Sequence, residues 1–261
     1  MSGREDEADA AAGKPSGNLA LFDLDHTLIP FDSGTAWIRF LMRHGRLPAD
    51  AEERHLAFCR LYVAGTLDIH AMHRSNMQPL LPVPRATLAQ WQREFEVDMA
   101  PRIPASSLAV VERHRANGDL CAIVTATTEL IAWPIARLFG IDELVATRPA
   151  TVDGLPDAAF TGEIDGEPCF RHHKVSRVTE WLARRPPGLG NRLADFAQSW
   201  FYSDAMSDLP LLAAVSHPVA VSPDDRLRAH ALRAGWPILD WGAAAFIETT
   251  ASHLPASGGG G

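Results

Sequence analysis

Short apolar runs alternate with longer helical patterns along most of this chain. The runs that predict strands lie at residues 19–22, 120–124, 200–202, 218–221 and 237–239. Because these runs are continuous rather than alternating, they are typical of strands buried on both faces of a parallel sheet. The patterns that predict helices lie at 107–116, 129–139, 175–183, 209–215 and 225–234. This alternation predicts an α/β fold with a doubly wound, mostly parallel sheet.

The segment from residue 30 to residue 104 has a different pattern. It holds no convincing strand, and it predicts helices at 35–44, 51–63 and 87–97. Open α/β sheets bind ligands at the carboxyl ends of their strands, so a helical insertion after the first strand is expected to cover the site. We therefore predict an all-helical cap at 30–104.

The remaining residues divide between a core and two tails. The predicted core comprises residues 18–29 and 105–241. Residues 1–17 are polar and lack periodicity, so a disordered tail is expected there. Residues 242–261 are expected to form a C-terminal segment that ends in a flexible, glycine-rich tail.

The composition narrows the range of partners. There are 24 lysines and arginines against 32 acidic residues, and a net charge of −8 argues against a nucleic-acid binder. No apolar run of membrane-spanning length and no secretory signal are expected. The three cysteines lack a paired motif, which fits a reducing cytoplasm and predicts no structural zinc site. The sequence does not define an oligomeric state.

Two pairs of carboxylates follow predicted strands. Asp23 and Asp25 come directly after the first apolar run, and residues at i and i+2 point roughly the same way. Two charges so close together need a cation or a shared proton. Asp204 and Asp208 flank a strand-to-helix turn and offer the hard oxygen ligands that suit Mg²⁺. Either pair could instead cap the turn that follows it.

A hydroxyl and a lysine complete the set. Thr125 follows the run at 120–124, where a hydroxyl beside exposed N–H groups can cradle a phosphate or serve as an ordinary N-cap. Lys174 taken alone would be a solvated surface lysine. In chain order, however, the residues form an acid pair, a hydroxyl, a lysine and an acid pair. Together they favour a site at the carboxyl edge of the sheet.

These residues resemble the four motifs of the haloacid dehalogenase superfamily of hydrolases. Residues 21–28, Leu-Phe-Asp-Leu-Asp-His-Thr-Leu, are similar to its DxDxT motif, and residues 123–127 are similar to its second motif. Lys174 is similar to the third motif, and residues 202–208 are similar to the fourth.

The insertion and two further stretches refine the resemblance. The segment 30–104 resembles a C1 cap, and residues 160–170 and 207–212 are similar to the phosphoserine-phosphatase-like subfamily IB. Some bacterial members of that subfamily are described as histidinol-phosphatases. The resemblance covers residues 18–241 and implies a core of the Rossmann-like type found in this superfamily.

The resemblance implies a phosphatase that uses Mg²⁺ and an aspartyl-phosphate intermediate to hydrolyse a small phosphorylated metabolite. Asp23 is then the nucleophile, and Asp25 is the general acid and afterwards the base. The implied Mg²⁺ ligands are an oxygen of Asp23, the backbone carbonyl of Asp25 and the carboxylate of Asp204.

Other residues are implied to hold the phosphate. Thr125, the N–H of Ala126 and Lys174 would contact or neutralise the phosphoryl oxygens. Asp208 would orient Lys174 or a metal-bound water.

Two positions depart from the family pattern. His172 and His173 stand where relatives commonly have Glu-Gly, and Ser207 stands where they often have Asn. The two histidines could be metal ligands, but adjacent side chains diverge, which favours a surface or substrate-gate pair. A serine also reaches less far than an asparagine, so both departures bear on substrate contacts and rate.

Asp32 lies nine residues beyond Asp23, where phosphoserine phosphatases have an acid that holds the substrate amino group. With Ser33, it could bind the amine of an amino-alcohol phosphate such as histidinol phosphate or phosphoserine. It could equally be the N-cap of the helix that starts near Thr35.

Two other functions stay open. A phosphotransferase or mutase would use a sugar or alcohol in place of water as acceptor. A non-catalytic regulator would bind a phosphorylated metabolite without turning it over.

Overall fold

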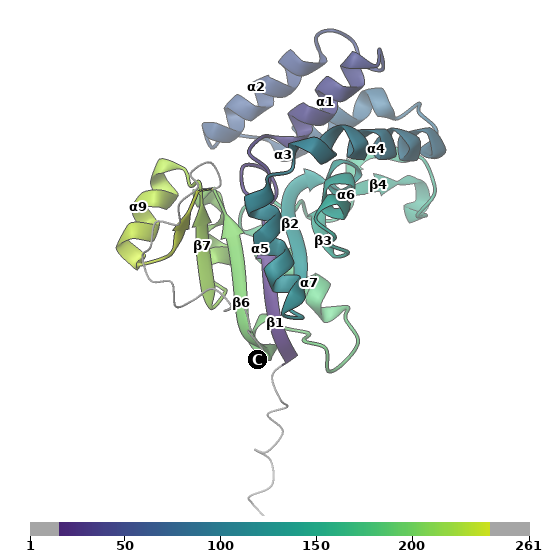
Figure 1. The fold of residues 1–261 in the computed structure, drawn as a ribbon. Helices are drawn as coiled ribbons and strands as arrows, with labels where there is room; N and C mark the ends of the chain where they lie inside the picture. The colour runs from purple at the N-terminus through teal and green to yellow at the C-terminus, as the bar shows by residue number, and fades with distance from the viewer. Residues whose placement is uncertain (1–15, 241–261) are drawn as a thin grey trace, which may run out of the picture.

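Within residues 16–240, which the computed structural model describes, six parallel strands form one sheet (Figure 1). Its order is β3-β2-β1-β6-β7-β8, and every neighbouring pair is parallel. The strands are β1 (Ser16–Phe22), β2 (Leu120–Thr128), β3 (Leu144–Thr147), β6 (Phe196–Ser203), β7 (His217–Val221) and β8 (Ile238–Leu239). The predicted doubly wound α/β fold is confirmed.

The predicted tails lie almost wholly outside the described residues. Residues 1–15 of the first tail and all of residues 242–261 lie outside the described residues. Ser16 and Gly17, however, already belong to β1, and Ser16 pairs with Phe196 of β6. Strand pairing uses backbone groups, so β1 extends beyond the apolar run from which it was predicted.

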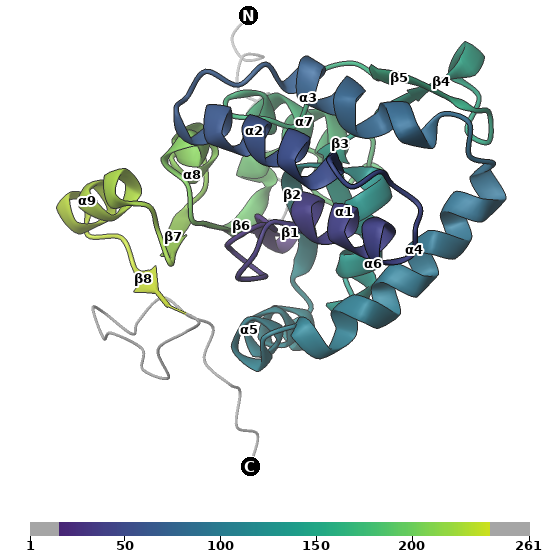
Figure 2. The ribbon, with the colours of Figure 1, turned by 90° about the horizontal axis from the view of Figure 1, so that it is seen from above.

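The hydrophobic core around the sheet forms two clusters, one on each face of the sheet, and β1 contributes residues to both. Ala20 and Phe22 face one apolar cluster, while Leu19 and Leu21 face the other. The helices α5 (Ala105–Ala116) and α6 (Glu129–Leu138) cover the first face. The opposite face is covered by α7 (His173–Ala183), α8 (Leu209–Leu212) and α9 (Asp225–Ala234). Figure 2 shows the sheet between α5 and α6 on one side and α7 and α8 on the other.

Three strands were missed by the sequence analysis. β3 has four residues, and β4 (Pro149–Thr151) and β5 (Phe160–Ile164) form a separate antiparallel pair. Pro149 and Gly162 interrupt the local pattern, and both residue types are depleted in strands. Pairing with a neighbour, rather than local pattern, therefore defines these strands.

The insertion between β1 and β2 is helical, as predicted. It contains α1 (Ser33–Arg43), α2 (Ala51–Val63), α3 (Ile69–Met77) and α4 (Arg85–Met99), with short 3-10 turns at Gln78–Leu80 and Ala100–Arg102. The short α3 was not predicted. Figure 1 shows these helices beyond the ends of β1 and β2, and Asp23 and Asp25 follow the end of β1 in the sequence. We propose, as the resemblance implied, that this segment is a cap.

Candidate active site

Asp23 lies where β1 ends, and its N–H donates to the carbonyl of Tyr202 on β6 at 2.9 Å. The register pairs Phe22 with Ile123 on β2 and with Tyr202 on β6. The ends of three parallel strands therefore meet at one edge of the sheet. This is the arrangement that brings predicted residues far apart in the sequence into one site.

Lys174 joins two of the predicted acids. Its Nζ donates to Asp23 Oδ1 at 2.8 Å and to Asp208 Oδ2 at 2.6 Å. The lysine is only 3% exposed, so it is not the surface residue that it would be in isolation. Burial alone would lower its pKa, but Asp208 and Asp23 raise the pKa well above the usual value. Lys174 is therefore charged, and Ser203 supports it by donating to Asp208 Oδ2 at 2.8 Å.

Thr27 ties the turn after β1 to the end of β6. Its hydroxyl lies 3.2 Å from Asp204 Oδ1 and 3.4 Å from Asp23 Oδ2, and it accepts a hydrogen bond from the Asp204 N–H at 3.0 Å. The turn needs a left-handed residue at His26, whose φ is +59°. The carboxylates of Asp23 and Asp204 therefore both contact one hydroxyl, that of Thr27, which is fully buried.

The charges in this site are unbalanced. Burial raises the pKa of Asp23 to about 7 despite the opposing effect of Lys174. Burial and the charge of Asp23 raise the pKa of Asp204 to about 8. Since one lysine faces Asp23, Asp204 and Asp208, the donor set is hard, oxygen-based and short of positive charge. These residues fit a divalent cation such as Mg²⁺.

This imbalance predicts how stability depends on pH without a divalent cation. Folded-state pKa values above the unfolded value of 3.8 mean that folded Asp23 and Asp204 bind protons more tightly than the unfolded chain does. Stability is then expected to fall as the pH rises from about 4 through 8. Added Mg²⁺ should raise the melting temperature more at about pH 9 than at about pH 6. An equal Mg²⁺ effect at both pH values would contradict the assignment.

Asp25 is held by residues from the cap and from β2. The Ser33 N–H donates to Asp25 Oδ1 at 2.6 Å, and Thr127 Oγ1 donates to Asp25 Oδ2 at 2.6 Å. Burial, followed by the charge of Asp32, raises the pKa of Asp25. The backbone of Ser33 therefore contacts the predicted acid, and the substrate contact of Ser33 stays a prediction. Thr127 was missed, although it stands in the second motif from which Thr125 was chosen.

The structure places Thr125 in β2, buried beside this network. Its Oγ1 accepts a hydrogen bond from the Thr127 N–H at 3.1 Å. The carbonyl of Ala126 accepts one from Thr147 on β3 at 2.8 Å. These contacts fix the carboxyl end of β2, and the phosphate contacts of Thr125 and Ala126 stay predictions.

The two departures from the family pattern differ in their surroundings. The rings of His172 and His173 lie 4.0 Å apart between centroids, so the expectation that the two side chains diverge is wrong. His172 is exposed, and His173 pairs with Glu167 at 2.9 Å. Ser207 contacts the cap, since its hydroxyl lies 3.2 Å from the hydroxyl of Tyr62 on α2.

Asp32 is the N-cap of α1. Its Oδ1 accepts from the Thr35 N–H and lies 3.1 Å from Nε2 of His55. Burial alone would raise the pKa of Asp32, but the hydrogen bonds from His55 and Thr35 lower it to about 2. Burial would lower the pKa of His55, but Asp32 and Cys59 raise it to about 10. The N-cap role that sequence left open is observed, and both contacts use the same carboxylate oxygen.

The fold and the site together define an α/β enzyme with a carboxylate-rich site at the carboxyl edge of its sheet. A family model for haloacid dehalogenase-like hydrolases matches residues 20–213. The chain therefore belongs to the haloacid dehalogenase-like hydrolase family, and the predicted enzyme class is confirmed.

The chain is also similar to individual proteins. It is 38% identical over 226 residues to a histidinol-phosphatase of Neisseria meningitidis serogroup C (strain 8013), covering 86% of this chain and 99% of that protein. A protein of unknown function from Bordetella pertussis Tohama I has a crystal structure with 43% identity and a TM-score of 0.77, covering 87% and 99% of the two chains. A phospho-aspartyl intermediate analogue of phosphoserine phosphatase shares the fold, with 18% identity, a TM-score of 0.57 and coverage of 87% and 94%.

One finding concerns membranes. Among residues 16–240, none of the helices is both long and apolar enough to cross a bilayer.

Proposed function

We propose that the protein hydrolyses the phosphomonoester of a small phosphorylated metabolite, with Asp23 as the nucleophile. The observation that carries this proposal is the buried ion-pair chain in which Lys174 joins Asp23 to Asp208 at the end of β1. The family membership and the phosphatase names of the relatives support the same reaction. The three cysteines of this chain are free, which is consistent with the cytoplasm as the proposed location.

In the proposed reaction Asp23 would attack phosphorus and form an aspartyl-phosphate. The paired Lys174 ammonium keeps positive charge beside the carboxylate, where the phosphoryl group would carry its negative charge. Asp208 and Ser203 fix the lysine, so no reorganisation is needed when the phosphate arrives. The predicted contacts of Thr125 and the Ala126 N–H would hold the remaining phosphoryl oxygens.

Asp25 is the proposed general acid. Burial raises its pKa, which favours the protonated form needed to give a proton to the leaving alkoxide. The resulting carboxylate can then take a proton from the water that hydrolyses the aspartyl-phosphate. Ser33 and Thr127 each hold one of its oxygens, so the carboxyl group is fixed in orientation through both steps.

Mg²⁺ fits the oxygen donors at the carboxyl edge. Asp23, Asp204 and the backbone carbonyl of Asp25 would hold it. When bound, the ion supplies positive charge that lets an anionic substrate approach an anionic nucleophile. The hydroxyl of Thr27 keeps the two carboxylates together for this purpose.

The proposed substrate class is an amino-alcohol phosphate, of which histidinol phosphate and phosphoserine are examples. The name of the Neisseria relative supports the first. Oδ1 of Asp32 is engaged by Thr35 and His55, so Oδ2 is the oxygen proposed to accept from the substrate amine. Ser33, the first residue of α1, stays a proposed second contact for this substrate.

A panel of phosphate esters with Mg²⁺ tests this proposal. Phosphate release should be fastest with an amino-alcohol phosphate and slower with sugar phosphates. Asp32→Asn should raise KM for the preferred amine about 10- to 100-fold, because a charged hydrogen bond is lost. The same change should leave p-nitrophenyl phosphate hydrolysis within about twofold. An equal loss with both substrates would assign Asp32 to cap structure rather than to amine binding.

The alternatives are separable in the same assay. A phosphotransferase or mutase would transfer phosphate to an added alcohol or sugar faster than it releases phosphate. A non-catalytic regulator would be stabilised by a phosphorylated metabolite without any release. The intact acid–lysine–acid chain favours hydrolysis over the regulator.

A further inference from the structure

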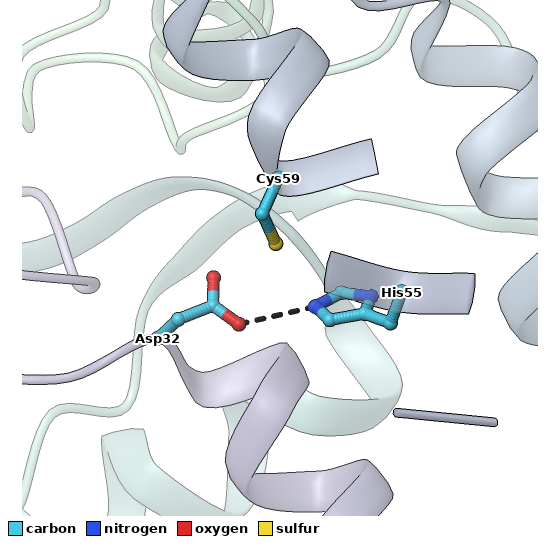
Figure 3. A group of neighbouring side chains, drawn as sticks. All are labelled: Asp32, His55 and Cys59. Atoms are coloured by element: carbon cyan, nitrogen blue, oxygen red, sulfur yellow. Dashed lines mark hydrogen bonds and ion pairs between the residues drawn. The ribbon is translucent and has the colours of Figure 1, made fainter. Parts of the chain in front are cut away.

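Three potential metal ligands converge in the cap, outside the acid pairs of the candidate active site. Oxygen of Asp32, nitrogen of His55 and sulfur of Cys59 all lie within 4.8 Å of one another. Figure 3 shows the carboxylate of Asp32 hydrogen-bonded to the imidazole of His55, with the sulfur of Cys59 above the space between them. From these residues we propose that the cap holds a Zn²⁺ site formed by Asp32, His55 and Cys59.

The backbone brings these ligands together from two helices. His55 and Cys59 are four residues apart on α2, so their side chains lie on one face of the helix. Asp32 is fixed as the N-cap of α1 by the Thr35 N–H. Gly34 leaves room for the imidazole, because a Cβ there would lie 2.9 Å from Cε1 of His55. A larger residue at position 34 would push the ring away from Asp32.

The two ring nitrogens of His55 have distinct partners. Nδ1 lies 3.3 Å from Oδ1 of Asn76 on α3, an acceptor that calls for a proton on Nδ1. Nε2 then faces the carboxylate of Asp32, which requires a second proton or a cation at that position. A neutral imidazole whose Nδ1–H is held by an amide oxygen is the usual form of a metal-bound histidine. Asn76 therefore serves as the supporting residue that such a site requires.

The donor set favours Zn²⁺ over Mg²⁺. Thiolate, imidazole and carboxylate together suit a borderline-soft ion, whereas Mg²⁺ takes oxygen ligands. Three protein ligands leave a fourth position for water or another small ligand. The cysteine spacing predicted no structural zinc site, because that signature requires cysteine pairs. This site uses one cysteine, and folding rather than sequence spacing assembles it.

Metal binding can be tested without the enzymatic reaction. Reduced, chelator-stripped protein is titrated with Zn²⁺ against a chromophoric chelator, with excess Mg²⁺ present to occupy the oxygen site. Co²⁺ replaces Zn²⁺ in a parallel titration, since a thiolate ligand gives a charge-transfer band that carboxylates do not. The variants are Cys59→Ser, His55→Gln and Asn76→Ala. His70→Gln is the matched control, because His70 is an exposed histidine on α3.

The wild type and His70→Gln should each bind one Zn²⁺ and show the thiolate–cobalt band. Asn76→Ala should lower Zn²⁺ affinity by about 10- to 100-fold, the usual loss when a supporting residue is removed. Cys59→Ser and His55→Gln should lose at least as much, and Cys59→Ser should also lose the band. Circular dichroism checks folding, and if Cys59→Ser fails to fold, His55→Gln and Asn76→Ala decide. A wild type without the band, or variants with unchanged Zn²⁺ affinity, would overturn the proposal.

Discussion

Replacing Asp23 by Asn is expected to lower kcat by roughly 10⁴- to 10⁶-fold with Mg²⁺ and a good phosphate ester, as for loss of a nucleophile in other enzymes. Asp23 is 7% exposed, ends β1 and receives the Lys174 ammonium on Oδ1. An amide at this position keeps the shape but is not a competent nucleophile for phosphorus. Release of inorganic phosphate, measured over time at saturating substrate, gives the comparison.

The variant should remain folded, which separates lost chemistry from lost structure. Asn removes a buried carboxylate whose pKa is raised to about 7, so metal-free stability above that pH is expected to be at least that of the wild type. Asp225→Asn is the matched control, because Asp225 is an exposed acid in the first turn of α9. Its rate should stay within about twofold of the wild type. Substantial activity in a folded Asp23→Asn protein would disprove the nucleophile assignment.

The strands that position the site could be predicted because their signal is local. The apolar runs before Asp23, Thr125 and Asp204 identify β1, β2 and β6, and parallel pairing then brings their ends together. β4 and β5 could not be predicted in this way, because a proline and a glycine interrupt short segments that only pairing stabilises. The residues of the candidate site divide in the same way, into those with a local sequence signal and those that are placed only by contacts.

Residues that support the reacting groups depend on contacts between distant segments. Ser33 reaches Asp25 from the start of α1, and Thr127 reaches it from β2, 102 positions further along the chain. The approach of His55 to Asp32 depends on how α1 packs against α2, which periodicity does not specify. Sequence therefore identified the charged groups, whereas these partners depend on contacts of the core strands with one another and with the cap.

Lys174 was predicted from the order of the motifs and not from its local pattern, which is typical of a surface residue, and it is buried between Asp23 and Asp208. Lys174→Met is expected to destabilise the fold by about 3–5 kcal/mol, since it leaves buried carboxylates without their cation. For a chain of this size, that loss lowers Tm by roughly 6–20 °C. Phosphatase activity of the fraction that stays folded should fall about 10²- to 10³-fold, because a fixed positive charge beside the phosphoryl group is lost. Thermal melts and phosphate release at a temperature below both transitions measure the two effects.

A second substitution distinguishes the buried charge from simple loss of packing. In Lys174→Met/Asp208→Asn, the carboxylate left without its partner becomes a neutral amide, so part of the lost stability should return while activity stays low. Arg184→Met is the surface control, because Arg184 is the C-cap residue of α7 and its side chain is 65% exposed and 3.9 Å from Glu180. Its effect should stay within about 0.5 kcal/mol. If the double variant is no more stable than Lys174→Met, the deficit arises from packing, and the ion-pair chain is not what stabilises this edge of the sheet.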